Sequence, residues 1–325
     1  MKAVRIHETG SVDVLKNEQL PDPVCKDHEV VVEIKSISVN FSDTLIRRGL
    51  YPYMPTFPAI LGNEAAGIIT QIGKDVNGLS KGQKVIVFGH PSYCTLSAVP
   101  ANKIIPLPDS IDLDEAAALP IIYQTAYHML HTVKRIKAGE TVLIYAAAGG
   151  VGTAVIQLGK LAGIKMIGLT STDDKAQQIK QLGIDHVINY KTENVVERVL
   201  ELTNGTGVDL ILDCVAGPKF DNNFKMMNTM GHLIWFGIAA GNPSTNLLTA
   251  LGKEPAKSYA VSMFHLYSII NNPKLMAASF KTLIGYLAEG KIKPIIYDRI
   301  TLDQAAKAHN ILEKHDNIGK VILKP

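Results

Sequence analysis

Residues 141–162 read TVLIYAAAGGVGTAVIQLGKLA, and this stretch decides the fold class of the chain. The apolar run at 141–146 predicts a buried strand, and 151–162 has the pattern of a helix. The glycine-rich loop between them matches the dinucleotide-binding fingerprint, with Ala147 in place of its first glycine. Glycines there let the backbone approach a pyrophosphate, which the N–H groups at the start of the helix bind; the alternative is a helix-capping turn without ligand. The candidate cofactor residues of this loop are Ala148, Gly149, Gly150, Val151 and Gly152.

Strands and helices continue to alternate after this unit. We expect strands at 165–169, 186–188, 208–213 and 232–236, and helices at 175–182 and around 195–202. This alternation predicts a parallel, doubly wound sheet, and therefore an α/β fold. Short β-branched runs between glycines and prolines predict a compact β-rich barrel or sandwich in the first hundred residues. The last sixty residues break the alternation, so this tail is a candidate to return to the first domain.

Composition excludes several function classes. The chain has 325 residues, of which 33 are basic and 30 acidic, so its formal net charge is +3. This near-balance supplies no broad basic face, and neither nucleic acid nor an anionic membrane is an expected partner. Residues 1–7 alternate as a strand does and lack the apolar stretch of a secretory signal, so we expect a cytoplasmic location. Cys25, Cys94 and Cys214 are too widely separated to predict a disulfide framework or a Cys-rich zinc site.

The end of the second expected strand bears on the choice of cofactor. An NAD-dependent enzyme usually places an acidic residue there, whereas this strand ends in Thr170-Ser171-Thr172 and Lys175 follows. Neutral hydroxyls and a lysine suit a 2′-phosphate, so NADPH is the expected cofactor. Asp173 and Asp174 oppose this unless they face solvent from the first turn of a helix, as we expect, because acidic residues suit that position. The alternative for Lys175 is a solvated helix residue.

Further segments carry a pattern that extends over essentially the whole chain. They are Gly139-Glu140-Thr141-Val142-Leu143, Gln157 and Lys160 around the glycine-rich loop, Asn40-Phe41-Ser42-Asp43, Arg47 with Gly49-Leu50-Tyr51-Pro52, Leu61-Gly62-Asn63-Glu64-Ala65-Ala66-Gly67, and Val187-Ile188-Asn189-Tyr190. On these residues the chain resembles the quinone oxidoreductase and zeta-crystallin group of the medium-chain dehydrogenase/reductase superfamily.

The resemblance implies two domains with the cofactor between them. Residues 1–121 with 262–325 would form a GroES-like β-rich catalytic domain, and 122–261 a Rossmann NADPH-binding domain. The site residues that it implies are Ser171, Lys175 and Tyr190 at the 2′-phosphate, Asn40, Tyr51, Asn63, Phe236, Gly237 and Ile238 on the nicotinamide side, and Asp43 and Lys320 near the cofactor. It also implies a homodimer, formed by extension of the cofactor domain's sheet near residues 231–250.

Departures from the wider superfamily argue against a catalytic metal. Zinc alcohol dehydrogenases have a cysteine where this chain has Asn40, and a Gly-His-Glu motif where it has Gly62-Asn63-Glu64. Catalytic zinc needs three protein ligands and an open position, so we expect no metal. His128 and His131 lie three residues apart on an expected helix, but no third ligand accompanies them, and we expect a packing or surface role for both.

These observations predict hydride transfer from NADPH to an electron-poor acceptor. Quinones and α,β-unsaturated carbonyls need less activation than a plain ketone, because charge spreads onto an oxygen that a few hydrogen bonds can stabilise. Asn40 and Asn63 are candidates to hold the cofactor or the acceptor oxygen, and Tyr51 is a candidate proton donor or, equally, a stacking residue. The alternatives are an enoyl-thioester or 2-alkenal reductase and a non-catalytic NADPH-binding protein.

Overall fold

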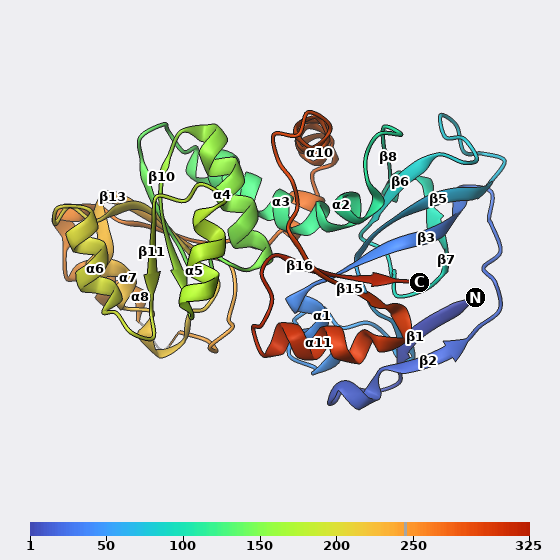
Figure 1. The fold of residues 1–325 in the computed structure, drawn as a ribbon, viewed down its shortest axis with the longest axis horizontal. Coiled ribbons are helices and arrows are strands. Elements are labelled where there is room, and N and C mark those ends of the chain that lie inside the picture. The colour runs from blue at the N-terminus through green and yellow to red at the C-terminus, as the bar shows by residue number, and fades with distance from the viewer. Residues whose placement is uncertain (244–245) are drawn as a thin grey trace. The chain divides into compact units, whose positions relative to one another are not determined.

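The computed structural model describes residues 1–243 and 246–325, and it divides the chain into two compact units (Figure 1). Unit 1 consists of residues 1–121 and 284–325, and unit 2 of residues 122–283. No helix among the residues that the structure describes is long and apolar enough to cross a membrane.

Unit 2 is built on a six-stranded sheet in which every neighbouring pair is parallel. Its strands are β9 (Thr141–Ile144), β10 (Lys165–Thr170), β11 (His186–Asn189), β12 (Val208–Asp213), β13 (Met227–Trp235) and β14 (Ala260–Met263). Their spatial order is β11-β10-β9-β12-β13-β14. Taken in chain order this is third, second, first, fourth, fifth and sixth, the order of dinucleotide-binding domains. The prediction of a doubly wound Rossmann sheet is confirmed.

The helices of unit 2 connect these strands and bury their faces. They are α4 (Gly150–Ala162), α5 (Asp173–Lys180), α6 (Val195–Leu202), α7 (Asn222–Met226), α8 (Leu247–Gly252) and α9 (Tyr267–Ile270), with short 3-10 segments at Gly217–Lys219 and Pro255–Lys257. Helix α4 packs on β10 and α5 packs on β11 (Figure 1). Because both faces of the sheet are covered, the strands are near-continuous apolar runs rather than alternating ones.

Unit 1 is β-rich, as the short runs of the first hundred residues predict. A three-stranded sheet has the order β2-β1-β4, and a seven-stranded one has the path β15-β16-β3-β5-β6-β8 with β7 paired to β3. The strands are β1 (Lys2–Ile6), β2 (Lys16–Gln19), β3 (Glu29–Val39), β4 (Ala59–Ile60), β5 (Glu64–Ile72), β6 (Lys84–Phe88), β7 (Leu96–Pro100), β8 (Ile104–Pro106), β15 (Ile296–Thr301) and β16 (Lys320–Lys324). The C-terminal strand β16 pairs antiparallel with β3, so the two ends of the chain share one core.

The helices of unit 1 lie around these sheets. They are α1 (Phe41–Arg47), α2 (Leu113–Ala118) and α11 (Ala305–Glu313), with 3-10 segments at Val12–Val14, Ala101–Lys103 and Leu302–Gln304. Helix α11 lies beside α1 (Figure 1).

Two helices span the unit boundaries: α3 (Pro120–Tyr127), which continues as a π-helix over His128–Lys134, and α10 (Pro273–Ala288). The second boundary falls after residue 283, later than the expected division after residue 261. Residues beyond 261 stay with unit 2 because Ser262 and Met263 complete β14. In addition, the buried Ser279 hydroxyl donates to Gln124 Oε1 over 2.6 Å.

Candidate active site

The glycine-rich loop leaves β9 at the point where the sheet order reverses. Gly149 is the N-cap of α4, and because it has no side chain, no cap hydrogen bond covers the first turn of that helix. The first N–H groups of a helix have no intrahelical partner. The loop therefore presents free N–H donors and the positive end of a helix dipole at the position where such sheets bind a pyrophosphate.

Close packing explains both the glycines of the loop and its departure from the fingerprint. A Cβ at Gly152 would lie 2.5 Å from the carbonyl oxygen of Ala147, so only glycine lets α4 pack against the loop. A Cβ at Gly168 on β10 would lie 2.8 Å from the Cβ of Ala147. The methyl group that replaces the first glycine of the fingerprint is therefore accommodated by a glycine on the neighbouring strand.

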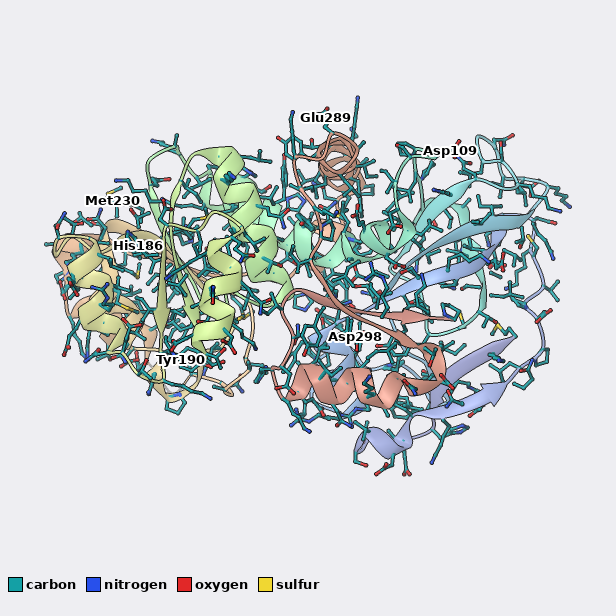
Figure 2. All side chains as sticks on the ribbon, in the orientation of Figure 1. Asp109, His186, Tyr190, Met230, Glu289 and Asp298 are labelled. Atoms are coloured by element: carbon teal, nitrogen blue, oxygen red, sulfur yellow. The ribbon has the colours of Figure 1, made fainter. Side chains whose placement is uncertain are left out.

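The three residues expected at the adenosine end come together in unit 2. The pairing of Thr170 with Asn189 in β10 and β11 places Ser171 and Tyr190 side by side, each directly after its strand, and the Tyr190 N–H donates to the Thr170 carbonyl over 3.0 Å. Tyr190, labelled in Figure 2, is about half exposed beyond the end of β11. Lys175 lies in the first turn of α5, which starts from the same strand end.

The two aspartates of this turn differ from each other. Both Asp173 and Asp174 are exposed, as expected, but Asp173 Oδ1 accepts a hydrogen bond of 2.8 Å from Asn189 Nδ2. This bond holds one carboxylate at the end of β11, beside a cavity of about 390 Å³ that Asp173, Asn189 and Lys180 help to line. A negative charge is therefore retained next to the expected phosphate position.

The segment at 236–238 follows β13 and lies on the loop that follows β12. The Phe236 N–H donates to the Asp213 carbonyl over 2.9 Å. A Cβ at Gly237 would lie 2.6 Å from the carbonyl oxygen of Cys214, so glycine is required for this approach. The loop that contains Phe236, Gly237 and Ile238 is thereby fixed at the carboxyl edge of the sheet, the edge from which the glycine-rich loop also emerges.

In unit 1 a buried ammonium joins three distant parts of the sequence. Lys320 Nζ donates to the Val39 carbonyl over 2.8 Å, to Asn40 Oδ1 over 2.6 Å and to Glu64 Oε1 over 3.1 Å. Asn40 Nδ2 donates to Glu64 Oε1 over 2.8 Å, and Glu64 Oε2 accepts from the Ile121 N–H over 2.7 Å. The side chains of Lys320 and Glu64 are 4% and 0% exposed. All three ammonium donors are satisfied, as a buried charge requires.

Strand register creates this cluster. Val321 of β16 pairs with Val39 of β3, which brings Lys320 opposite Asn40. Ile37 of β3 pairs with Ala65 of β5, which brings Glu64 to the same end of β3. A shift of one residue in either pairing would turn one of these side chains to the other face of the sheet.

The remaining expected residues lie on elements next to the cluster. Asp43, in the first turn of α1, accepts from the Asn40 N–H over 2.9 Å. Burial raises the pKa of Asp43 to about 6, although that hydrogen bond, the Lys320 charge and the Tyr93 hydroxyl all act to lower it. Asn63, half-buried, immediately precedes Glu64. The ring of Tyr51, in the loop after α1, packs edge-on against Tyr53 with centroids 6.3 Å apart.

Sequence reasoning did not select Glu64 as a site residue, although it lies within the segment Leu61–Gly67 that carries the resemblance. The signal was a carboxylate at the start of an apolar strand, EAAGII, which must find partners if it is buried. Tyr93 and His309 were also missed, because nothing in their local sequence indicates that they meet.

The expected packing role of the histidine pair in unit 2 agrees with the environment of His128. It is buried, with Nδ1 2.8 Å from Thr132 Oγ1 and Nε2 3.1 Å from both Gln124 Oε1 and Ser279 Oγ. Burial lowers the pKa of His128 to about 4, with a smaller contribution from His131. Within residues 1–243 and 246–325, no group of three His, Cys, Asp or Glu side chains is arranged to hold a metal ion.

Comparison with known proteins matches a part of each unit to a known domain family. Residues 26–109 match the alcohol dehydrogenase GroES-like domain family, and residues 150–279 match the zinc-binding dehydrogenase family. A quinone oxidoreductase of Salmonella typhimurium is 33% identical, with 99% of each chain covered. The chain belongs to the quinone oxidoreductase group of the medium-chain dehydrogenase/reductase superfamily.

Solved structures support this membership. The Escherichia coli quinone oxidoreductase complexed with NADPH has a TM-score of 0.92 at 32% identity, with 100% of both chains covered. A mycobacterial protein complexed with NADPH has a TM-score of 0.92 at 30% identity, also over 100% of both chains. The resemblance to the quinone oxidoreductase group, based on motifs, is thus confirmed over the full length.

Proposed function

We propose that this quinone oxidoreductase family member reduces quinones or other electron-poor enones with NADPH, without a metal ion. When bound, NADPH supplies a hydride, and the chain supplies binding, orientation and hydrogen bonds. The observation that carries the proposal is the Asn40–Glu64–Lys320 cluster, because its chemistry limits how an acceptor can be activated.

The cluster does not fit a zinc ion, although the matching family is described as zinc-binding. Zinc in proteins takes thiolate, imidazole or carboxylate ligands. Here the Asn40 amide nitrogen donates to Glu64, and the Lys320 ammonium lies 3.1 Å from the same carboxylate oxygen. A divalent cation at Glu64 would meet that positive charge inside the protein. Acceptors that need no Lewis acid, namely quinones and enones, are therefore the best match.

The hydrogen bonds of the cluster also limit what Asn40 can offer. Its Oδ1 is taken by Lys320, and one Nδ2 hydrogen is taken by Glu64. One amide hydrogen remains, so Asn40 acts as a donor to the nicotinamide or to the acceptor oxygen. Asn63 serves as a second amide beside it. Tyr51 either donates a proton to the reduced acceptor or stacks against it. Either role requires its ring to lie next to the acceptor.

The residues that we assign to the cofactor lie mainly in the segments that follow β9, β10, β11 and β13 in unit 2. The loop from Ala148 to Gly152 binds the pyrophosphate through the free N–H groups in the first turn of α4. Ser171, Lys175 and Tyr190 bind the 2′-phosphate, since a lysine and two hydroxyls suit an extra phosphate. The segment Phe236 to Ile238 lies along the nicotinamide half, and Asp43 and Lys320 act through the cluster. We retain a cytoplasmic location as a prediction.

An acceptor panel tests the proposed function. With NADPH, we expect turnover of a simple quinone and of a short enone, and much slower turnover of crotonyl thioester, a substrate of the alternative enoyl reductase. Plain aldehydes and ketones are expected to be inert. Spectrophotometric oxidation of NADPH gives kcat/KM for each acceptor; a preference for crotonyl thioester would favour the alternative, and no turnover of any acceptor would refute the proposal.

Substitution of Lys175 by alanine tests the phosphate site. A hydrogen bond to a charged partner contributes about 1.5–3 kcal/mol, so Lys175→Ala should raise the KM for NADPH roughly ten- to a hundredfold. Use of NADH should be almost unchanged, because only NADPH has the 2′-phosphate. Lys165→Ala, at the exposed first residue of β10 and so at the opposite end of that strand from Ser171, is the matched control. Equal loss with both cofactors would contradict the assignment.

We also propose a homodimer formed by extension of the sheet of unit 2, as expected, but at β14 rather than near residues 231–250. β13 (Met227–Trp235) has a neighbour on each side, β12 and β14, so it cannot pair with a second chain. The sheet ends at β11 on one side and at β14 (Ala260–Met263) on the other, and it is β14, next to β13, that carries Met263 with 75% of its surface exposed. An unpaired edge strand with an apolar side chain is suited to pairing across a twofold axis.

The dimer predicts a mass of two chains by light scattering at working concentration. Replacing Val261 by proline removes a backbone donor from the edge strand and should shift the mass toward one chain. Met230→Ser, which removes another exposed methionine on an interior strand, is the control. A wild-type mass of one chain would contradict the proposal.

A further inference from the structure

A chain of hydrogen bonds in unit 1 links α1, α11 and the loop before β7. Arg47 Nε donates to His309 Nδ1 over 3.3 Å, His309 Nε2 lies 3.2 Å from Tyr93 Oη, and Tyr93 Oη donates to Asp43 Oδ2 over 3.1 Å. All four residues are at most 2% exposed. Burying polar groups costs free energy unless hydrogen bonds satisfy them, so each bond of this network requires a definite arrangement of donor and acceptor.

Arg47 fixes the donor and the acceptor of every hydrogen bond in this network. Arginine has donors and no acceptor, so His309 Nδ1 must be the acceptor of the Arg47 bond. Burial, together with the charge of Arg47, lowers the pKa of His309 to about 3, so its ring is neutral at physiological pH. The single ring proton is therefore on Nε2, which donates to Tyr93 Oη, and the Tyr93 hydroxyl hydrogen must then point at Asp43.

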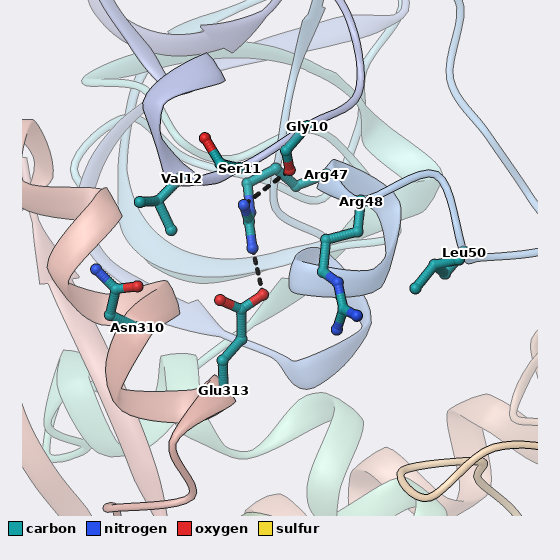
Figure 3. A pocket seen from close by; sticks show the side chains of 8 residues that line it. All are labelled: Gly10, Ser11, Val12, Arg47, Arg48, Leu50, Asn310 and Glu313. Carbon is teal, nitrogen blue, oxygen red and sulfur yellow. Dashed lines mark hydrogen bonds and ion pairs between the residues drawn. The ribbon is translucent and has the colours of Figure 1, made fainter.

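This fixed direction argues against a proton path from the surface. The outer end of the chain faces a cavity of about 670 Å³, shown in Figure 3, where Arg47 donates to the Gly10 carbonyl over 2.9 Å and pairs with Glu313. A guanidinium does not release its proton at physiological pH. Protons from this cavity therefore stop at Arg47, and the chain orients groups rather than conducting protons.

The group that is oriented is Asp43, and through it Asn40. Asp43 Oδ2 accepts from both the Tyr93 hydroxyl and the Asn40 N–H, whereas Asp43 Oδ1, buried, has no hydrogen-bond partner in the described part of the chain. The carboxylate is thus held through one oxygen. Its bond to the Asn40 N–H fixes the backbone from which the Asn40 side chain extends to Glu64 and Lys320.

We propose that Arg47, His309 and Tyr93 are positioning residues that act through Asp43 to hold the Asn40 amide in its reactive orientation. The inference deepens the proposed function, on which it rests, because it takes Asn40 as a donor at the reacting end. These residues touch neither the acceptor nor the cofactor in this account. Their loss should therefore lower kcat and leave the KM for NADPH unchanged.

Tyr93→Phe is the direct test. It removes only the hydroxyl that points at Asp43, and we expect kcat with a quinone to fall about tenfold, the effect of one hydrogen bond to a charged partner. Tyr259→Phe is the matched control, because that hydroxyl also makes one internal hydrogen bond, 2.9 Å to the Phe224 carbonyl in unit 2, and kcat should not change. A fall in kcat no larger than that of the control would overturn the proposal.

A pair of histidine variants separates positioning from packing. The glutamine of His309→Gln can accept from Arg47 and donate to Tyr93 at once, so its kcat should stay within about threefold of wild type. His309→Leu keeps the volume and loses both bonds, so its kcat should fall as in Tyr93→Phe. Equal kcat for the two variants would contradict a positioning role.

The pH profile gives a second readout that a purely structural role would not move. The charged groups that face Asp43 are Lys320 and Glu64, and the Tyr93 hydroxyl lowers its pKa. Losing that hydroxyl raises the pKa of Asp43, so if the ionised form orients Asn40, the acid limb of kcat in Tyr93→Phe should move upward from about pH 6. An unmoved limb would count against the role of Asp43.

The tautomer of His309 tests the network independently of any enzymatic activity. Nitrogen NMR of the wild-type protein at neutral pH should show a neutral ring with its proton on Nε2. A proton on Nδ1, or a charged ring, would overturn the direction of the chain. If the wild type reduced no acceptor and yet had the Nε2 tautomer, the proposed function would fail while the network stood.

Discussion

The Lys320 ammonium is held away from water by the Val39 carbonyl, the Asn40 amide and the Glu64 carboxylate, and the arrangement of unit 1 depends on this contact. A buried charge is tolerated only where partners satisfy it, and removing one partner typically costs about 3–5 kcal/mol. The cluster joins β3, β5, β16 and the first residues of α3, through Ile121. The C-terminal strand is therefore tied to the same point as the N-terminal segment.

The same contact also determines the chemistry. In the proposed function, the buried Lys320 ammonium beside Glu64 occupies the place that a metal would need, and the acceptor is one that accepts hydride without a Lewis acid. The hydrogen-bonded chain from Arg47 to Asp43 reaches the cluster from its other side, through the Asn40 backbone. Asn40 is thus fixed twice, by Asp43 at its N–H and by Lys320 and Glu64 at its amide, which leaves one hydrogen to donate.

Local signals in the sequence predicted five of the six strands of the sheet in unit 2, but neither β14 nor the boundary after residue 283. The strand, glycine-rich loop and helix at 141–162 form one contiguous motif. The alternation of strands and helices after it predicted a parallel sheet. The accommodation of Ala147 by Gly168 was not foreseeable, because it joins two strands. Nor was the edge position of β14, which lies beyond the residues at 231–250 that the resemblance indicated for the dimer.

Unit 1 was harder to predict because its site depends on register. Asn40, Glu64 and Lys320 are widely separated in sequence, and only the pairings of β3 with β5 and β16 bring them together. Asn40, Asp43 and Lys320 were identified by resemblance, whereas Glu64, Tyr93 and His309 required the tertiary structure. A tyrosine and a histidine in separate segments carry no sign of their meeting.

The most direct test of the account is the activity of protein without metal. Protein treated with a strong chelator, and shown by elemental analysis to hold no zinc, is assayed with NADPH and a quinone. Because the Lys320 ammonium already neutralises Glu64, the account predicts the same kcat before and after treatment, with no effect of added zinc. Loss of activity on chelation, recovered by one zinc ion per chain, would contradict it.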